Sequence, residues 1–107
     1  MRYPRVDMEG LTAIVALAET SDMAKAGELL HIGPGAVIKR LSKAENELFA
    51  KLFRKTNNRI ALTADGRIYC SEASLAIEHA VLAEEKITAT RRLRERRRLV
   101  GRSTKCL

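Results

Sequence analysis

The stretch LLHIGPGAVIKRLSKAENEL, from Leu29 to Leu48, decides the fold, because it begins as one helix, stops at GPG and resumes at once as another. Gly33 stands where an N-cap belongs, and Pro34 takes the first helical position, where its missing N–H is not needed. A tight turn between two packed helices is therefore expected, and the second helix must keep one face free. That helix is predicted over residues 34–48, and its inward stripe is Val37, Leu41, Ala44 and Leu48.

Two more helices are expected before this turn. Apolar residues at three- and four-residue spacing predict an amphipathic helix over residues 8–20, with Asp7 as its N-cap. Residues 23–31 predict a short second helix that Ser21 or Asp22 could cap. The inward stripe predicted for the first helix is Met8, Leu11, Ile14, Val15 and Ala18.

A small basic hairpin is expected after the turn, in AKLFRKTNNRIALTADG, residues 50–66. Leu52 and Phe53 resemble strand anchors, TNNR supplies a turn, and RIALT alternates sides as a second strand. Thr63 then caps a long helix with Asp65 in its first turn. Three helices followed by such a wing make a winged helix-turn-helix, a mainly α fold in which the helix after the turn enters the DNA major groove.

The long helix, expected over residues 64–95, carries two apolar stripes. One stripe can pack on its own domain, while the Ala-rich one needs a partner helix and predicts a homodimer. The first stripe is Ile68, Leu75 and Leu82. The Ala-rich stripe is Tyr69, Ala73, Ala76, Ile77, Ala80, Ala83 and Ile87. The domain organisation expected is a DNA-binding domain over residues 1–63, a linker and dimerisation helix over 64–95, and a basic tail over 96–107.

The formal net charge of +7 is concentrated in two blocks. Residues 34–59 carry seven basic and two acidic groups, a net of +5, and residues 91–107 carry eight and one, a net of +7. Such blocks attract polyanions, so nucleic acid is the expected partner. A membrane is not expected, because no apolar run has the length of a spanning helix and the N-terminus lacks the apolar core of a signal peptide.

Neither catalysis nor metal binding is expected. His31 and His79 are isolated from any second ligand, and Cys70 and Cys106 have no metal-like spacing. Two free thiols in a reducing compartment, and hence a cytoplasmic location, are the preferred interpretation. The sequence offers no nucleophile with its base, no paired carboxylates and no strand-to-helix glycine loop for phosphate, so it predicts no enzyme and no cofactor.

From residue 7 to about residue 95 the chain resembles the N-terminal domain of LysR-type transcriptional regulators, a bacterial family. The most specific pieces are KAGELLHIGPGAVIKRLSKAENEL (residues 25–48), LFRKTNNRIALTADG (residues 52–66) and the helix that follows. The resemblance implies a dimer, joined through the linker helix, that binds a partly symmetric operator on double-stranded DNA. It also implies that LVGRSTKCL, residues 99–107, starts the first strand of a C-terminal effector domain. A small-molecule effector would act only through that domain, and a full-length form could be a tetramer.

The chain departs from the family pattern at several positions. The family usually places Ser, Gln and a Pro or Ser at residues 33–35, and often Ser or Thr at Ile38. Those side chains cap the helix and touch bases and phosphates, so several polar readers are missing here, although backbone N–H groups can still hold a phosphate. The family's usual Gly is Phe49 and its Leu is Ala44, which predicts local repacking of the core.

Taken with the turn, the wing and the family register, the basic residues of the expected helix and hairpin predict one DNA-binding surface. Two alternatives stay open: a winged-helix interaction module with degenerate base readout, and the related N-terminal domain of molybdate-responsive regulators. The tail TRRLRERRR, residues 90–98, is either a nucleic-acid arm or a charged linker. The predicted DNA-binding residues are Gly33, Pro34, Gly35, Ile38, Lys39, Arg40, Lys43, Arg54, Lys55, Asn57, Asn58 and Arg59.

Overall fold

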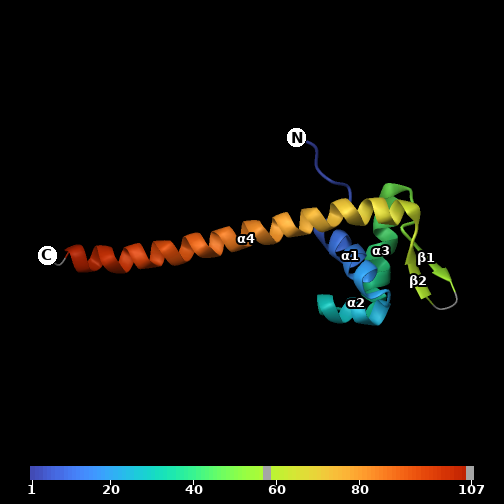
Figure 1. The fold of residues 1–107 in the computed structure, drawn as a ribbon, viewed down its shortest axis with the longest axis horizontal. Helices are drawn as coiled ribbons and strands as arrows, with labels where there is room; N and C mark the ends of the chain where they lie inside the picture. The colour runs from blue at the N-terminus through green and yellow to red at the C-terminus, as the bar shows by residue number, and fades with distance from the viewer. Residues whose placement is uncertain (57–58, 106–107) are drawn as a thin grey trace. The chain divides into compact units, whose positions relative to one another are not determined.

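The computed structural model describes residues 1–56 and 59–105. It confirms the predicted fold class, with three helices, a two-stranded antiparallel wing and a long helix. Figure 1 shows α1, α2 and α3 gathered together, with the β1–β2 hairpin beside them. The elements in chain order are α1 (Met8–Thr20), α2 (Met23–Leu30), α3 (Pro34–Leu48), β1 (Phe53–Thr56), β2 (Arg59–Leu62) and α4 (Ala64–Lys105).

The first two helices begin where side-chain caps satisfy N–H groups of their first turns. Asp7 accepts a 2.8 Å hydrogen bond from the Gly10 N–H and so starts α1, as predicted. Asp22 accepts from the Lys25 N–H at 2.9 Å and starts α2. Ser21 is instead the left-handed C-cap of α1, with φ 55°. Of the two caps considered for α2, Asp22 is therefore the one used.

The buried face of α1 differs from the predicted stripe. Met8 is exposed, and Val15 and Ala18 are only partly buried. The side chain of Met8 is 47% exposed, so its assignment to the core was wrong. The residues of α1 that are buried are Gly10, Leu11, Ala13, Ile14, Ala16 and Leu17.

The core draws its largest fully buried side chains from α1, from α3 and from the residue before the wing. The first turns of α4 complete it with Cys70, Ala73 and the partly buried Tyr69. The fully buried group is Ile14, Leu17, Val37 and Leu52. Burial raises the pKa of the Cys70 thiol, which keeps it as an unreactive thiol, while Cys106 lies outside the described residues.

This arrangement corrects the predicted roles of the two α4 stripes. Ala73, predicted to face a partner, is buried in the core of its own chain. Ile68, the first member of the stripe predicted to pack on the domain, is 69% exposed, and Leu75 and Leu82 are exposed too. The two stripes lie on different sides of one helix, and periodicity alone does not say which side meets the domain.

The position of Phe49 is also corrected. Phe49 is 88% exposed and is the left-handed C-cap of α3, with φ 53°, so it does not repack the core. The family's Gly suits such a position because it has no Cβ to meet the following carbonyl. Ala44, in contrast, is buried as predicted.

The long helix α4 continues to Lys105. The prediction that the helix ends near residue 95, and that a strand begins at residue 99, was therefore wrong for the described residues. The chain divides into two compact units, of which the first is Met1–Ile77 and the second begins at Glu78. The first unit extends beyond residue 63 because the opening turns of α4 contribute Cys70 and Ala73 to its core.

Candidate nucleic-acid interface

The turn into α3 is open and carries no side-chain cap. Gly33 is the N-cap with φ −74° and ψ 160°, and Pro34 is the first helical residue, as predicted. The Ala36 N–H already donates to the Gly33 carbonyl at 3.1 Å, and Pro34 has no N–H, so Gly35 supplies the first N–H available to an anion. A Cβ added at Gly33 or Gly35 would meet nothing within 4 Å. The helix start therefore has room for close approach of another molecule.

A second glycine, Gly27, shapes the same turn from the α2 side. A Cβ at Gly27 would come within 2.5 Å of the Ile32 carbonyl oxygen, so only glycine lets the chain fold back this tightly. The Ile32 N–H donates to the Gly27 carbonyl at 2.9 Å, which closes the turn. Gly27 and its hydrogen bond with Ile32 therefore determine where the chain turns from α2 towards α3.

One face of α3 is exposed along its whole length. Its members follow a four-, three- and four-residue spacing, which places them on one side of a helix, opposite the buried Val37 and Leu41. Ile38 is half exposed beside this face. We call these residues the outer face of α3: Gly35, Lys39, Ser42 and Asn46. Sequence reasoning missed Ser42 and Asn46, although their spacing from Lys39 was visible.

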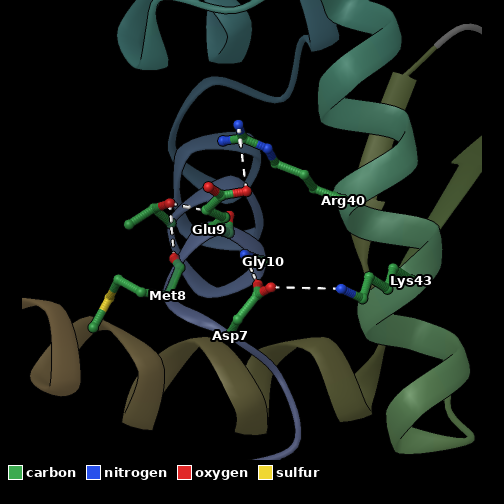
Figure 2. Close-up of polar contacts among 7 residues, drawn as sticks. Asp7, Met8, Glu9, Gly10, Arg40 and Lys43 are labelled. Atoms are coloured by element: carbon green, nitrogen blue, oxygen red, sulfur yellow. Dashed lines mark hydrogen bonds and ion pairs between the residues drawn. The ribbon is translucent and has the colours of Figure 1, made fainter.

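Arg40 and Lys43 lie toward α1, away from this set. Figure 2 shows both side chains extending from α3 to the first turn of α1, where Arg40 Nη2 lies 3.6 Å from Glu9 Oε2 and Lys43 Nζ lies 3.6 Å from Asp7 Oδ2. The Gly10 N–H hydrogen bond, with a smaller contribution from Lys43, lowers the pKa of Asp7. The two cations thus connect α3 to α1, and the exposed Lys43–Asp7 pair is weak enough to be exchanged for phosphate.

Glu45, near the end of α3, connects this helix to the start of the wing through hydrogen bonds. Sequence reasoning did not single out this residue. Its side chain is buried, and Oε2 accepts the Leu52 N–H at 2.7 Å and the Phe53 N–H at 3.4 Å. Lys51 Nζ lies 3.8 Å from the other carboxylate oxygen. A charged side chain next to Ala44 on the inward side of α3 was the only sequence signal for this role.

The wing separates its predicted basic residues between two faces. Lys55 is opposite Ile60, and Arg54 is opposite Ala61, in the antiparallel register. Because successive side chains alternate, Arg54 and Arg59 share one face of the hairpin and Lys55 lies on the other. All three cations are exposed. Asn57 and Asn58, predicted for the wing tip, lie outside the described residues.

The residues predicted for dimerisation differ in exposure in the single chain. Tyr69 and Ala73 belong to the core of their own chain, and burial raises the pKa of the Tyr69 hydroxyl. Ile77 and Ala80 are partly buried. Ala76, Ala83 and Ile87 are exposed. The prediction for the later residues of this stripe stays a prediction.

Residues 1–56 and 59–105 hold no cluster of three His, Cys, Asp or Glu side chains suited to a metal ion. In the same residues, no helix combines the length and apolarity that crossing a membrane requires.

Comparison with known proteins places this geometry in a family. Residues 8–67, more than half of the chain, match the model described as bacterial regulatory helix-turn-helix protein, lysR family. An uncharacterized HTH-type regulator in the ibpB-leuC intergenic region of Azotobacter vinelandii is 39% identical over 62 residues, covering 58% of this chain and 43% of the relative. The uncharacterized HTH-type regulator YbhD of Escherichia coli K12 is 34% identical over 67 residues, covering 63% of this chain and 21% of its own length.

Solved structures agree with these sequence relatives. The DNA-binding domain of CbnR, in a complex with DNA, matches with a TM-score of 0.70 and 25% identity over 78% of this chain and 97% of that one. The full-length OxyR of Pseudomonas aeruginosa matches with a TM-score of 0.73 and 25% identity, covering 78% of this chain and 28% of that one. The chain thus spans less than half the length of the two curated relatives above. From the turn, the wing and the family match together, the chain belongs to the lysR family of bacterial regulatory helix-turn-helix proteins.

Proposed function

We propose that this chain is the DNA-binding part of a bacterial transcriptional regulator and binds double-stranded DNA through α3 and the wing. The observation that carries the proposal is the outer face of α3, which is exposed and polar on the second helix of a helix-turn-helix. The solved complex of the CbnR DNA-binding domain with DNA supports this choice of ligand. A cytoplasmic location and the absence of enzymatic activity follow from this role.

The contacts divide into positioning and reading. Gly35 presents its N–H to a phosphate at the positive end of α3, and Lys39 adds a cation one turn further. Ser42 and Asn46 supply hydrogen-bonding groups for base edges, and Ile38 supplies an apolar contact suited to a thymine methyl group. Arg54 and Arg59 place two cations on one face of the wing, where they can contact phosphates or the minor groove.

Two copies act together in this proposal. The later residues of the Ala-rich stripe on α4 pair with the same stripe of a second copy, which presents two α3 helices to a partly symmetric site. This proposal assigns DNA contact to residues 1–63, dimerisation to residues 64–95 and a basic tail to residues 96–107, the last two sharing the one helix α4 up to Lys105.

A second candidate function is a winged-helix interaction module that has lost base readout. Two observations favour it. Residues 33–35 offer no polar side chain at the groove, and the charges of Arg40 and Lys43 are partly neutralised by Glu9 and Asp7. Such a module would pair with another regulator through α4 without recognising a sequence.

A selection experiment separates the two candidates. The whole chain is incubated with a pool of randomised duplexes, bound DNA is recovered over several rounds, and affinity is then compared between the selected site and a scrambled duplex. A specific reader prefers the selected site by at least about a thousandfold at physiological salt. Failure to enrich any sequence, with equal binding to both duplexes, would favour the interaction module.

A further inference from the structure

The second half of α4 contains an arginine cluster that neither the fold nor the proposed reading surface uses. Six of the eight residues over 91–98 are arginines, and all of them are exposed. The one acid of the segment, Glu95, pairs with Arg98 at 3.7 Å. The segment therefore has a net charge of +5, from six basic groups and one acidic group. We call it the arginine segment: Arg91, Arg92, Arg94, Arg96, Arg97 and Arg98.

The helix distributes these charges around its axis. Arg91, Arg94 and Arg98 follow a three- and four-residue spacing and share one face, while Arg92 and Arg96, four residues apart, share another. Leu93 is the one apolar side chain within residues 91–98. A helix that lies in a membrane interface needs a continuous apolar face, and this segment has none. The pattern therefore favours a polyanion in water over a lipid surface.

The charge density matches that of a nucleic acid. Eight helical residues span about 12 Å at 1.5 Å per residue, so six cations lie about 2 Å apart along the axis. Duplex DNA carries one negative charge per roughly 1.7 Å of its axis. The whole segment is about as long as the Debye length of roughly 8 to 10 Å in ordinary salt, so its cations act together on such a ligand.

In the helical segment, arginines of like charge lie close together and repel each other, and a bound polyanion would relieve this repulsion. Arg92 and Arg96, and likewise Arg94 and Arg98, are like charges at four-residue spacing, which destabilises a helix by a few tenths of a kcal/mol per pair. A ligand that neutralises these pairs binds the helical state preferentially and stabilises it. Arginine is suited to that ligand, because its planar guanidinium binds phosphate with two parallel hydrogen bonds.

We propose that the arginine segment is a second DNA-binding surface, which contacts the phosphates of double-stranded DNA without reading its sequence. This surface adds affinity to that of α3 and the wing, and it rests on the proposed function only for the choice of duplex DNA as the polyanion. Because its contacts are ionic, its contribution appears mainly in the salt dependence of binding.

The test compares the native whole chain with two variants of one face. The first variant is Arg91→Gln, Arg94→Gln, Arg98→Gln, and the matched control is Arg91→Lys, Arg94→Lys, Arg98→Lys, which keeps the charge. Glutamine, lysine and arginine have similar helix propensities, and circular dichroism checks that helix content is unchanged. Fluorescence anisotropy measures binding to a scrambled 30-base-pair duplex, and to the selected duplex, at several salt concentrations.

In a plot of the logarithm of the binding constant against the logarithm of the salt concentration, the glutamine variant is expected to have a slope that is shallower by roughly 2 to 3. Each lost phosphate contact removes about 0.9 from the magnitude of this slope. Its affinity for scrambled DNA should fall at least about tenfold at low salt, while the lysine control keeps the native slope. The proposal is overturned if the glutamine variant has the native slope and affinity. If the slope depends on the segment but no sequence is preferred, the second surface stands and the proposed reading by α3 fails.

Discussion

The carboxylate of Glu45 accepts the backbone N–H of Leu52 at 2.7 Å, which joins the inward side of α3 to the residue before the wing. Both groups are buried, so this hydrogen bond fixes where the wing begins relative to the helix proposed to lie in the groove. An unpaired N–H at Leu52 would lose its water without gaining another partner.

Glu45→Ala is expected to destabilise the chain by about 1 to 3 kcal/mol, because it leaves the Leu52 N–H unsatisfied. Glu45→Gln keeps an acceptor oxygen and should cost less. Chemical denaturation followed by circular dichroism measures both variants. Equal stability of the native chain and the alanine variant would show that the hydrogen bond is not needed to hold the wing.

Asp7 makes stability depend on pH in the acid range. Its pKa is lowered in the folded chain, first by the Gly10 N–H and then by Lys43, so its contribution is present above the ordinary aspartate value of 3.8 and is lost as pH falls through the lower folded value. Asp7→Asn keeps the N-cap but cannot titrate. The urea midpoint of the asparagine variant should fall less between pH 5 and pH 2 than the native one. Parallel pH profiles would contradict this role.

Two glycines should respond oppositely to alanine. A Cβ at Gly66 would collide with the Leu52 carbonyl oxygen, so Gly66→Ala should cost about 1 to 3 kcal/mol through forced movement of the chain. Gly35 has open space around it, and Gly35→Ala should leave stability unchanged or raise it by up to about 1 kcal/mol. Thermal melting curves of the two variants, recorded side by side, check the contrast. A stable Gly66→Ala would mean that α4 does not approach Leu52 this closely.

Phe49 is a site for stabilisation. Its left-handed backbone costs a residue with a Cβ about 1 to 2 kcal/mol, and its exposed ring gives little packing in return. Phe49→Gly should therefore raise stability by up to about 1 kcal/mol after the backbone entropy of glycine is subtracted. Phe49→Ala is the control, because it removes the ring but keeps the strain. A glycine variant no more stable than the alanine variant would show that the left-handed backbone carries no such cost.

The sequence predicted the fold well where local signals were strong. The caps at Asp7 and Thr63, the GPG turn and the anchors of the wing each have a local physical cause, and the structure confirms them. The wrong predictions depended on tertiary contacts. Which stripe of α4 meets the domain is decided by how Cys70 and Ala73 fit the core, and periodicity cannot decide between two apolar sides.

The candidate site was predicted less completely for a similar reason. Charge and family register identified Lys39, Arg40 and Lys43, but not that Glu9 and Asp7 approach the latter two from another helix. Ser42 and Asn46 carry no charge, so the charge pattern does not single them out, although they share a face with Lys39. In the sequence Glu45 is indistinguishable from an ordinary helix charge, because only the fold brings it to its partners Leu52 and Phe53.

The central claim is that the outer face of α3 reads double-stranded DNA, and one binding measurement tests it most directly. Affinities for the selected and the scrambled duplex are compared for the native chain, for Ser42→Ala with Asn46→Ala, and for Ser71→Ala, which removes an exposed hydroxyl from α4 as a control. We expect the double variant to lose about 1 to 3 kcal/mol of preference for the selected duplex, while the control keeps it. Full preference retained by the double variant would contradict the account.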